Sequence, residues 1–221
     1  MPELPEVETT KTSLLPLLDQ KVLNVEVRQA NLRWPIPENL HKLTGQKLLQ
    51  LTRRSKYILA QFEQDSMLWH LGMSGSFRLC DAHEDLRKHD HLIIQFEDIQ
   101  LRYHDPRRFG CILWLNESSQ RKLIDPLGPE PLSDAFNPDY LAQKLKNKNV
   151  GIKVAIMDNH VVVGVGNIYA TESLFNLGIH PAQPASSLSL AQVEKLVIEI
   201  KRILKQAIDL GGSTLRDYSN A

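Results

Sequence analysis

The chain has 221 residues, of which 42% are hydrophobic and 24% are charged, and its 26 basic residues balance its 26 acidic ones. This composition predicts a globular protein of one large or two small domains, and no apolar run is long enough for a membrane span or a signal peptide. The isoelectric point of about 7.1 argues against a nucleic-acid binder with an overall basic excess, although basic residues can still gather on one face. Two cysteines, Cys80 and Cys111, are too few for a disulfide framework or a CxxC metal site and fit a reducing cytosol.

The chain opens with Met-Pro-Glu, and removal of Met1 would leave Pro2 with a free secondary amine. An α-amino group titrates at about pH 8, so part of it is unprotonated and nucleophilic at neutral pH. Its attack on a sugar C1′ or a carbonyl carbon forms an iminium ion, which is an electron sink for later elimination. Glu3 could then act as general acid or base, and Glu6 and Glu8 add carboxylates. The alternative is that Met-Pro has no catalytic role and that the acidic residues only favour the N-terminus of a helix.

Residues 3–18 have helical apolar spacing, and Pro16 should bend or end that helix. Its apolar face consists of Val7, Leu14, Leu15 and Leu18. From residue 21 to about 115, short segments rich in β-branched and aromatic residues alternate with turns, which predicts a β-sandwich or barrel. Residues 23–27 alternate, and further strands are predicted at 46–51, 57–62, 67–71, 92–97, 100–103 and 111–115.

Residues 116–138 have the composition of a loop, and we place a domain boundary near residue 130. After it, helices are predicted at 138–147, 152–158 and 167–177, and a longer one after Ser189. The fold class is therefore predicted as α+β, with an N-terminal helix and β-sandwich in residues 1–130 and a helical domain in residues 131–221.

The last helix has the clearest signals of the sequence. Ser189 with Gln192 predicts a capping box, and Gly211-Gly212 predicts a C-terminal stop. Its apolar face consists of Leu190, Val193, Leu196, Val197, Ile200, Ile203 and Leu204.

Three loops of the first half are candidates for ligand contact. The run Arg-Arg-Ser-Lys at 53–56 is either a solvated turn or a phosphate contact made by Lys56. Residues 70–76 are rich in Gly and Ser around Met73, which suits close approach to a ligand backbone. The turn at 105–110 offers two arginines and Phe109. An arginine with an apolar wedge is what a protein needs to enter a DNA stack, and the alternative is a hairpin with this phenylalanine in the core.

The second half adds a basic cluster and a glycine-rich turn. The cluster consists of Lys144, Lys146, Lys148 and Lys153. The turn at 164–167 precedes a helix and is similar to a phosphate-cradling turn, although it is not a G-x-G-x-x-G dinucleotide motif. Basic loops are thus present in both predicted domains despite the neutral total charge, and a DNA-binding surface becomes plausible.

The motifs resemble those of the formamidopyrimidine-DNA glycosylases, which are bifunctional base-excision repair enzymes. The matching segments run in the family's order along essentially the whole chain: PELPEVE (2–8), RRSKY (53–57), HLGMSG (70–75), KHDH (88–91), DPRRFG (105–110), LGPEPL (127–132) and VVVGVGNIYA (161–170). The related endonuclease VIII family shares the N-terminal proline but usually has Gly where this chain has Leu4, which favours the first family.

The resemblance implies a role for each matching residue. Pro2 would be the Schiff-base nucleophile, Glu3 the proton donor and shuttle, and Lys56 a phosphate contact that assists β-elimination; Glu6 is counted with these catalytic residues. Met73, Arg107 and Phe109 would fill the gap left by the flipped base, with Arg107 reading the orphaned cytosine. The other implied DNA-binding residues are His70, His89, Lys148, Lys153 and Asn167, the last of these at the turn of a helix-two-turn-helix module.

The resemblance also implies the reaction and its setting. A monomer in the bacterial cytosol would remove oxidised purines, chiefly 8-oxoguanine and formamidopyrimidines, from duplex DNA and then cut the strand by β,δ-elimination. Family members continue into a four-cysteine zinc finger, which these 221 residues lack. No metal or cofactor is therefore expected here, and one structural zinc is expected only in a longer chain. The chain would be a truncated enzyme or a natural short form with weakened DNA binding.

Three alternatives stay open at this point. The chain could be a binding-only or inactive relic of the family, or an endonuclease VIII-like glycosylase for oxidised pyrimidines. It could also be a proline-based enzyme that acts on small molecules, as tautomerases do. The Arg-Phe wedge and the basic loops argue against this last alternative, because a small substrate has no use for them.

Overall fold

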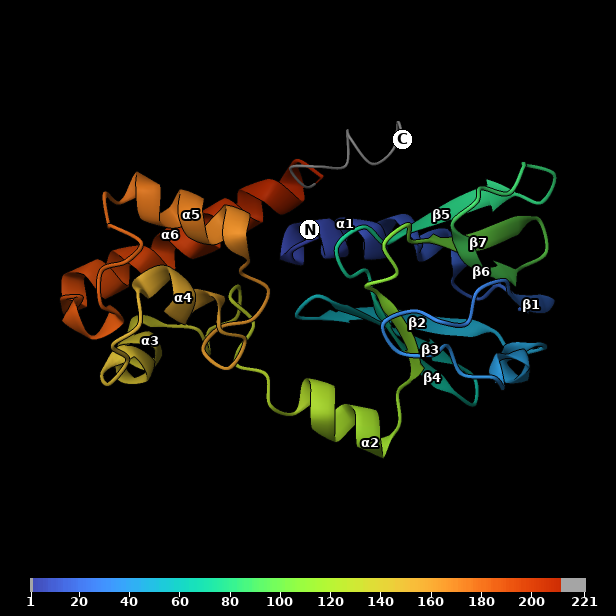
Figure 1. Ribbon diagram of the computed structural model, residues 1–221, viewed down its shortest axis with the longest axis horizontal. Helices are drawn as coiled ribbons and strands as arrows, with labels where there is room; N and C mark the ends of the chain where they lie inside the picture. Colours follow the sequence, from blue (N-terminus) through green and yellow to red (C-terminus); the bar gives the residue numbers. More distant parts are fainter. Residues whose placement is uncertain (1, 212–221) are drawn as a thin grey trace. The chain divides into compact units, whose positions relative to one another are not determined.

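The computed structural model describes residues 2–211 (Figure 1). Its contacts divide the chain into two compact units. The β unit contains Pro2 and Val7–Lys122, and the helical unit contains Glu3–Glu6 and residues 123–211. By their contacts, Glu3–Glu6 therefore belong to the helical unit, although they lie in the sequence between two stretches of the β unit.

The N-terminal helix α1 spans Leu4–Ser13 and is followed by the 3₁₀ turn η1, Leu15–Leu17. Pro16 lies in this turn, as expected of a residue that ends an α-helix. The tighter turn changes the period of the apolar face. Leu17 is fully buried, whereas Leu15 is largely exposed, so the prediction that Leu15 lies on the apolar face is wrong.

Within residues 2–211, the β unit has two antiparallel sheets of four strands, in the orders β1-β6-β7-β5 and β2-β3-β4-β8. The strands are β1 (Asn24–Val27), β2 (Leu48–Arg54), β3 (Tyr57–Phe62), β4 (Ser66–His70), β5 (Ser76–Asp81), β6 (Asp90–Gln95), β7 (Ile99–His104) and β8 (Cys111–Trp114). One core contains buried residues of both sheets and of the 3₁₀ turn η2 (Leu40–Leu43). Trp69 of β4 packs on Phe77 of β5 with ring centroids 4.8 Å apart. The predicted β-sandwich is confirmed.

Strand β5 is the one that the sequence pattern did not reveal. Its buried residues do not alternate cleanly, and it follows directly on the Gly- and Ser-rich loop that hides its start. Arg78 in this strand donates two hydrogen bonds of 3.0 Å to the carboxylate of Asp90 in β6. The strand is therefore held by an ion pair across the sheet as well as by its apolar residues.

The predicted loop 116–138 begins with a helical segment. The short helix α2 (Glu117–Ser119) runs into the π-helical turn η3 (Gln120–Ile124). The side chain of Asn116 accepts a hydrogen bond from the Ser119 N–H, and the Ser119 hydroxyl accepts one from the Asn116 N–H. These polar residues form a capping box rather than a turn, which is why the loop prediction is wrong here.

The helical unit contains α3 (Pro138–Leu145), α4 (Ile152–Met157), α5 (Asn167–Asn176), the 3₁₀ turn η4 (Ala185–Ser187) and α6 (Leu190–Asp209). These bounds confirm the predicted helices, and the Ser189–Gln192 capping box is present. The predicted apolar face of α6 is buried apart from Leu190, which is exposed in the first turn. Gly211 follows α6 with a φ of +82°, as a helix stop requires, and Gly212 lies outside the described residues.

The α+β fold class is thus confirmed by a helix and β-sandwich followed by helices. No helix in the described part of the chain is long and apolar enough to cross a membrane.

Candidate functional site

Glu3, the predicted acid beside the reactive amine, lies at the N-terminus of α5. Its carboxylate accepts hydrogen bonds from the N–H groups of Gly166 and Ile168 at 2.8 and 2.9 Å. A longer bond of 3.4 Å comes from the N–H of Tyr169. The side chain is buried, with 1% of the residue exposed. Because the first N–H groups of a helix lack intrahelical partners and carry the positive end of its dipole, they favour an ionised carboxylate at this place.

The glycine-rich turn before α5 is shaped to receive the first residues of the chain. A Cβ atom on Gly166 would lie 2.3 Å from Cδ of Glu3. Gly164 has a φ of +78°, and a Cβ atom there would lie 2.6 Å from Cβ of Leu4. The sequence predicts that this turn cradles a phosphate. In the structure one N–H group of this turn, that of Gly166, and two of the first turn of α5, those of Ile168 and Tyr169, donate to the carboxylate of Glu3.

Glu6 is buried beside Glu3 and contacts α5 as well. Its Oε1 accepts the hydroxyl of Tyr169 at 2.6 Å, and its Oε2 accepts the backbone N–H of Glu3 at 2.9 Å. That N–H belongs to the peptide that joins Pro2 to Glu3. The carboxylates of Glu3 and Glu6 therefore both fix the backbone next to Pro2, which is itself buried.

Lys56 lies in the tight turn between β2 and β3, after Ser55, which has a φ of +56°. Arg53 in the same basic run pairs with Glu8 of α1 at 2.7 Å. Burial acts to raise the pKa of Glu8, but hydrogen bonds from Lys11 and Arg53 outweigh it and lower that pKa. In this basic run, Arg53 thus pairs with α1, whereas Lys56 lies in the turn.

His70 ends β4, and its Nδ1 accepts the N–H of Gly72 at 3.1 Å. In a neutral ring with this bond, Nε2 carries the proton and is a donor. Burial, together with the positive charges of Lys56 and Arg33, lowers the pKa of His70 to about 4. At neutral pH the ring is therefore an uncharged hydrogen-bond donor with cationic groups nearby, which suits contact with a phosphate.

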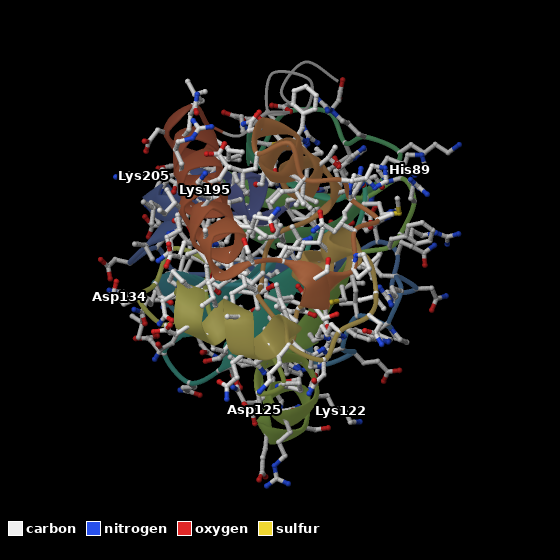
Figure 2. All side chains as sticks on the ribbon, turned by 90° about the vertical axis from the view of Figure 1, so that its left-hand side faces the viewer. His89, Lys122, Asp125, Asp134, Lys195 and Lys205 are labelled. Carbon is white, nitrogen blue, oxygen red and sulfur yellow. The ribbon has the colours of Figure 1, made fainter. Side chains whose placement is uncertain are left out.

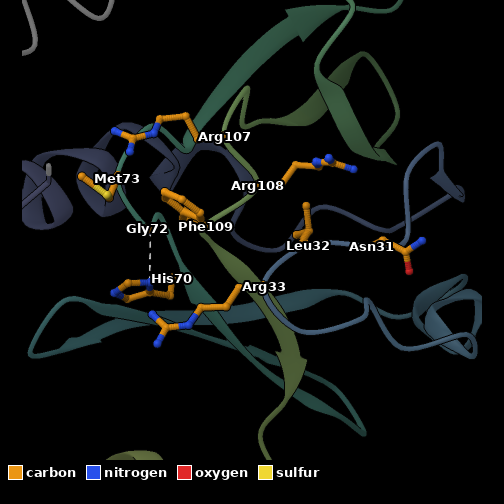
Figure 3. Close-up of a pocket in the computed structure, with 9 residues that line it drawn as sticks. All are labelled: Asn31, Leu32, Arg33, His70, Gly72, Met73, Arg107, Arg108 and Phe109. Carbon is orange, nitrogen blue, oxygen red and sulfur yellow. Dashed lines mark hydrogen bonds between the residues drawn. The ribbon is translucent and has the colours of Figure 1, made fainter.

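A pocket of about 710 Å³ in the β unit brings four of the predicted DNA-binding residues together (Figure 3). These residues are His70, Met73, Arg107 and Phe109. The guanidinium carbon of Arg107 lies 4.9 Å from the ring centroid of Phe109. Phe109 is 42% exposed, so the alternative that it is part of the core is wrong.

The same pocket contains residues to which the sequence analysis gave no individual role, two of which, Gly72 and Arg108, lie within the matching motifs. They are Asn31, Leu32, Arg33, Gly72 and Arg108. Arg108 is the second arginine of the Asp-Pro-Arg-Arg turn and has a φ of +56°, which directs it differently from its neighbour. Arg33 lies in a segment without strand or helix spacing, and Figure 3 shows its guanidinium beside the ring of His70. Its only sequence signal is a basic residue before Trp34, whose ring centroid lies 5.7 Å from the guanidinium carbon.

His89 lines a second pocket of the β unit, of about 370 Å³, with the basic residues Arg28, Lys88 and Arg108. Asp90 also lines it, and its fully buried carboxylate is paired with Arg78 at 3.0 Å. Burial acts to raise the pKa of Asp90, but hydrogen bonds from the Arg87 backbone, His104 and Arg78 outweigh it and lower that pKa. Three basic residues line this pocket, and the buried carboxylate of Asp90 is already paired with Arg78, so the charge of the lining suits an anion.

The predicted lysines of the helical unit differ in their surroundings. Lys148 donates to Oδ2 of Asp158 at 3.1 Å, so part of its charge is balanced within the unit. Lys153 lies in α4, half-buried, and Asn167 is exposed as the first residue of α5. Lys195 and Lys205 of α6 are further exposed lysines (Figure 2) that the motifs did not indicate.

No group of three or more His, Cys, Asp or Glu residues in the described chain could hold a metal ion. Cys80 and Cys111 are buried free thiols in β5 and β8. Burial raises the pKa of the Cys111 thiol to about 12 and also raises that of Cys80, so neither is a ready metal ligand or nucleophile.

Comparison with known families matches both halves of the chain. Residues 1–112 match the formamidopyrimidine-DNA glycosylase N-terminal domain, and residues 127–219 match the H2TH domain of the same family. A formamidopyrimidine-DNA glycosylase of Acinetobacter baumannii is 80% identical over all of this chain and 81% of its own length. One of Acinetobacter baylyi is 76% identical over all of this chain and 82% of its own length.

Solved structures agree with these matches. The Lactococcus lactis Fpg bound to DNA that contains FAPY-dG superposes with a TM-score of 0.89 at 33% identity, over 96% of this chain and 82% of the other. Its complex with DNA that contains an abasic site gives a TM-score of 0.88 at 34% identity, over 96% of this chain and 80% of the other. The fold, the N-terminal motif and the loops of the pocket agree with these matches, and the chain belongs to the formamidopyrimidine-DNA glycosylase family.

Proposed function

We propose that this protein is a base-excision repair enzyme that removes oxidised purines, such as 8-oxoguanine and formamidopyrimidines, from duplex DNA and then cleaves the strand. The proposal rests above all on Glu3, which directly follows Pro2 and is held by the N–H groups of Gly166 and Ile168. It is supported by relatives named for this activity and by the Lactococcus lactis Fpg complexes with FAPY-dG and abasic-site DNA.

In the proposed reaction the amine of Pro2, freed by removal of Met1, attacks C1′ of the damaged nucleotide. The C1′–N bond to the base breaks as the new C–N bond forms, and the departing base takes a proton from solvent. Opening of the sugar then gives an iminium ion. An ionised Glu3 is suited to take the amine proton and to return it to the sugar oxygen. The iminium acidifies the 2′ protons, so that β-elimination and then δ-elimination of the phosphates follow from the choice of nucleophile.

The β unit supplies the proposed contacts to the DNA backbone and stack. Lys56 and His70 are assigned to phosphate, and Met73, Arg107 and Phe109 to the gap left by the extruded nucleotide. Extrusion of a paired base costs roughly a few kcal/mol, which side chains in the gap offset. The remaining assignments, also proposals, are Glu6 for catalysis and His89, Lys148, Lys153 and Asn167 for DNA binding.

The proposal includes the location of the enzyme in the cell and its oligomeric state. We assign the enzyme to the bacterial cytosol and expect it to act as a monomer. A structural zinc is proposed only for a longer chain that carries the family's four-cysteine finger.

Borohydride trapping on a duplex with 8-oxoguanine opposite cytosine tests the proposal. Reduction of the iminium should give a covalent protein–DNA adduct, and a Pro2→Gly variant should form none. Two further substrates separate the alternatives: a duplex with dihydrouracil, a pyrimidine lesion with a saturated 5,6-bond, and an undamaged duplex. Equal trapping on dihydrouracil would favour an endonuclease VIII-like specificity. Binding without trapping or base release from any lesion would contradict the catalytic proposal.

A further inference from the structure

Two loops that line the 710 Å³ pocket are packed against each other without intervening side chains. One is the loop 71–75, which carries Met73, and the other is the turn 105–110, which carries Arg107 and Phe109. A Cβ atom on Gly72 would lie 2.4 Å from the carbonyl carbon of Phe109. The backbones therefore meet in direct contact, and the spacing of the side chains on the two loops depends on what joins them.

The hydroxyl of Ser74 joins them. It donates a hydrogen bond to Oδ1 of Asp105 at 2.6 Å, and its oxygen accepts the backbone N–H of Arg107 at 3.2 Å. The side chain of Ser74 thus connects the loop that carries Met73 to Asp105 and Arg107 of the opposite turn.

The Asp105 end of this link is fixed. Asp105 is fully buried, and its other oxygen, Oδ2, accepts the hydroxyl of Tyr103 at 3.1 Å and the N–H of Gly110 at 2.9 Å. Because both oxygens are used and the residue lies in the core, the carboxylate is a rigid anchor. Ser74 transmits that rigidity to the Arg107 backbone, which has fewer constraints of its own at the exposed tip of the turn.

We propose that Ser74 is a positioning residue that holds Met73 and Arg107 at a fixed spacing for entry into the DNA stack. The inference rests on the proposed glycosylase function. Ser74 acts through the backbone of Arg107 and through the loop of Met73, not by touching the reacting atoms. Only a hydroxyl can donate to the carboxylate and accept from the N–H at once, so alanine should break both bonds and threonine should keep them.

The predicted effect depends on the substrate. A duplex with 8-oxoguanine must have a stacked, paired base extruded before reaction, whereas an abasic site has no base to extrude. If Met73 and Arg107 are no longer held at the spacing that fills the gap, base excision should therefore slow more than strand cleavage at an abasic site. We expect Ser74→Ala to lower the ratio of the two single-turnover rates by roughly five- to tenfold, the range of one or two weak hydrogen bonds.

The experiment compares four proteins on both substrates: wild type, Ser74→Ala, Ser74→Thr and Ser13→Ala. Ser13 is the control, because its hydroxyl makes a bond within its own helix, to the carbonyl of Thr10 at 2.7 Å, and not one between two loops of the pocket. Wild-type ratios in Ser13→Ala and Ser74→Thr, with a lowered ratio in Ser74→Ala, support the inference.

Other outcomes overturn it. A parallel fall of both rates in Ser74→Ala would mean general destabilisation of the β unit, and an unchanged ratio would mean that the hydroxyl positions nothing. If the wild-type protein is active on both substrates, such results overturn only the inference about Ser74 and not the proposed function. Inactive wild type on both substrates would instead remove the proposed function, and the inference with it.

Discussion

The carboxylate of Glu3 lies against the backbone of Gly166, whose N–H donates to it at 2.8 Å. This contact joins two motifs that are 163 residues apart: the acidic N-terminus and the glycine-rich turn before α5. The acid next to the proposed nucleophile is thereby held by the N-terminus of a helix that is remote in the sequence. Catalytic groups that are already in place lower the cost of reaching the reactive geometry. Only a glycine before α5 leaves room for the carboxylate, because a Cβ atom on Gly166 would lie 2.3 Å from Cδ of Glu3.

We predict that Gly166→Ala inactivates the enzyme. The new Cβ would lie 2.3 Å from Cδ of Glu3, so the carboxylate must move, and a shift of about 1 Å in a catalytic group costs roughly 100-fold in rate. Overpacking should also lower the free energy of unfolding by about 1–3 kcal/mol. Single-turnover kinetics and urea unfolding measure the two effects.

Gly178→Ala is the matched control for that prediction. Gly178 follows the other end of α5, has a φ of +64°, and has no heavy atom within 4 Å of the place that a Cβ atom would take. Alanine there should cost about 1–2 kcal/mol of backbone strain and leave the rate of chemistry at the wild-type value. Equal rates for the two variants would contradict the role given to Gly166.

We predict that Tyr169→Phe destabilises the N-terminal segment. The change removes the 2.6 Å hydrogen bond to Glu6, and a buried carboxylate that loses a donor costs about 1–3 kcal/mol. Because Glu6 also accepts the N–H of Glu3, the adduct yield in borohydride trapping should fall as well. Tyr140→Phe, which removes a bond to the carbonyl of Val161 away from these acids, should leave the adduct yield unchanged; a parallel loss would argue against a specific role for Tyr169.

The elements of the fold were predictable where local chemistry determines them. The capping box at Ser189 fixes the start of α6, and Pro16 ends the α-helix of the N-terminus. Strand β5 was missed because its buried residues do not alternate cleanly and it directly follows the Gly- and Ser-rich loop. Helix α2 was missed because the polar residues that cap a helix are also the residues that form turns.

The site was predictable as a set of motifs but not as an arrangement. Met73, Arg107 and Phe109 line one pocket, as the resemblance implies. The occupation of the α5 N–H groups by Glu3 depends on a contact between remote segments, which no local pattern encodes. Arg33 could not be found for the same reason: only the fold brings its segment to His70.

We predict that acid unfolding depends on Asp158. Burial acts to raise the pKa of Asp158, but hydrogen bonds from His160 and Lys148 outweigh it and lower that pKa from 3.8 to about 2. Since the folded state has the lower pKa, the stabilisation is complete above about pH 4 and is lost as the pH falls toward about 2. Asp158→Asn should abolish this part of the pH dependence in urea unfolding between pH 2 and 6. Asp134→Asn, at an exposed position of the same unit (Figure 2), should keep the wild-type curve, and a change there would argue for a general charge effect.

We predict that Arg33→Gln changes both a titration and DNA binding. Burial is the largest cause that lowers the pKa of His70 to about 4, and the positive charges of Lys56 and Arg33 add to it. Removal of the Arg33 charge should therefore raise that pKa only part of the way toward the ordinary 6.5, as measured by NMR of the His70 ring. If the guanidinium also contacts a phosphate, the slope of log affinity against log salt should become shallower by about 0.9. Arg121→Gln is the control, because this exposed arginine of η3 pairs with Glu117 of α2 and does not line the pocket. A raised His70 pKa with an unchanged salt slope would identify Arg33 as an electrostatic neighbour of His70 that does not contact DNA.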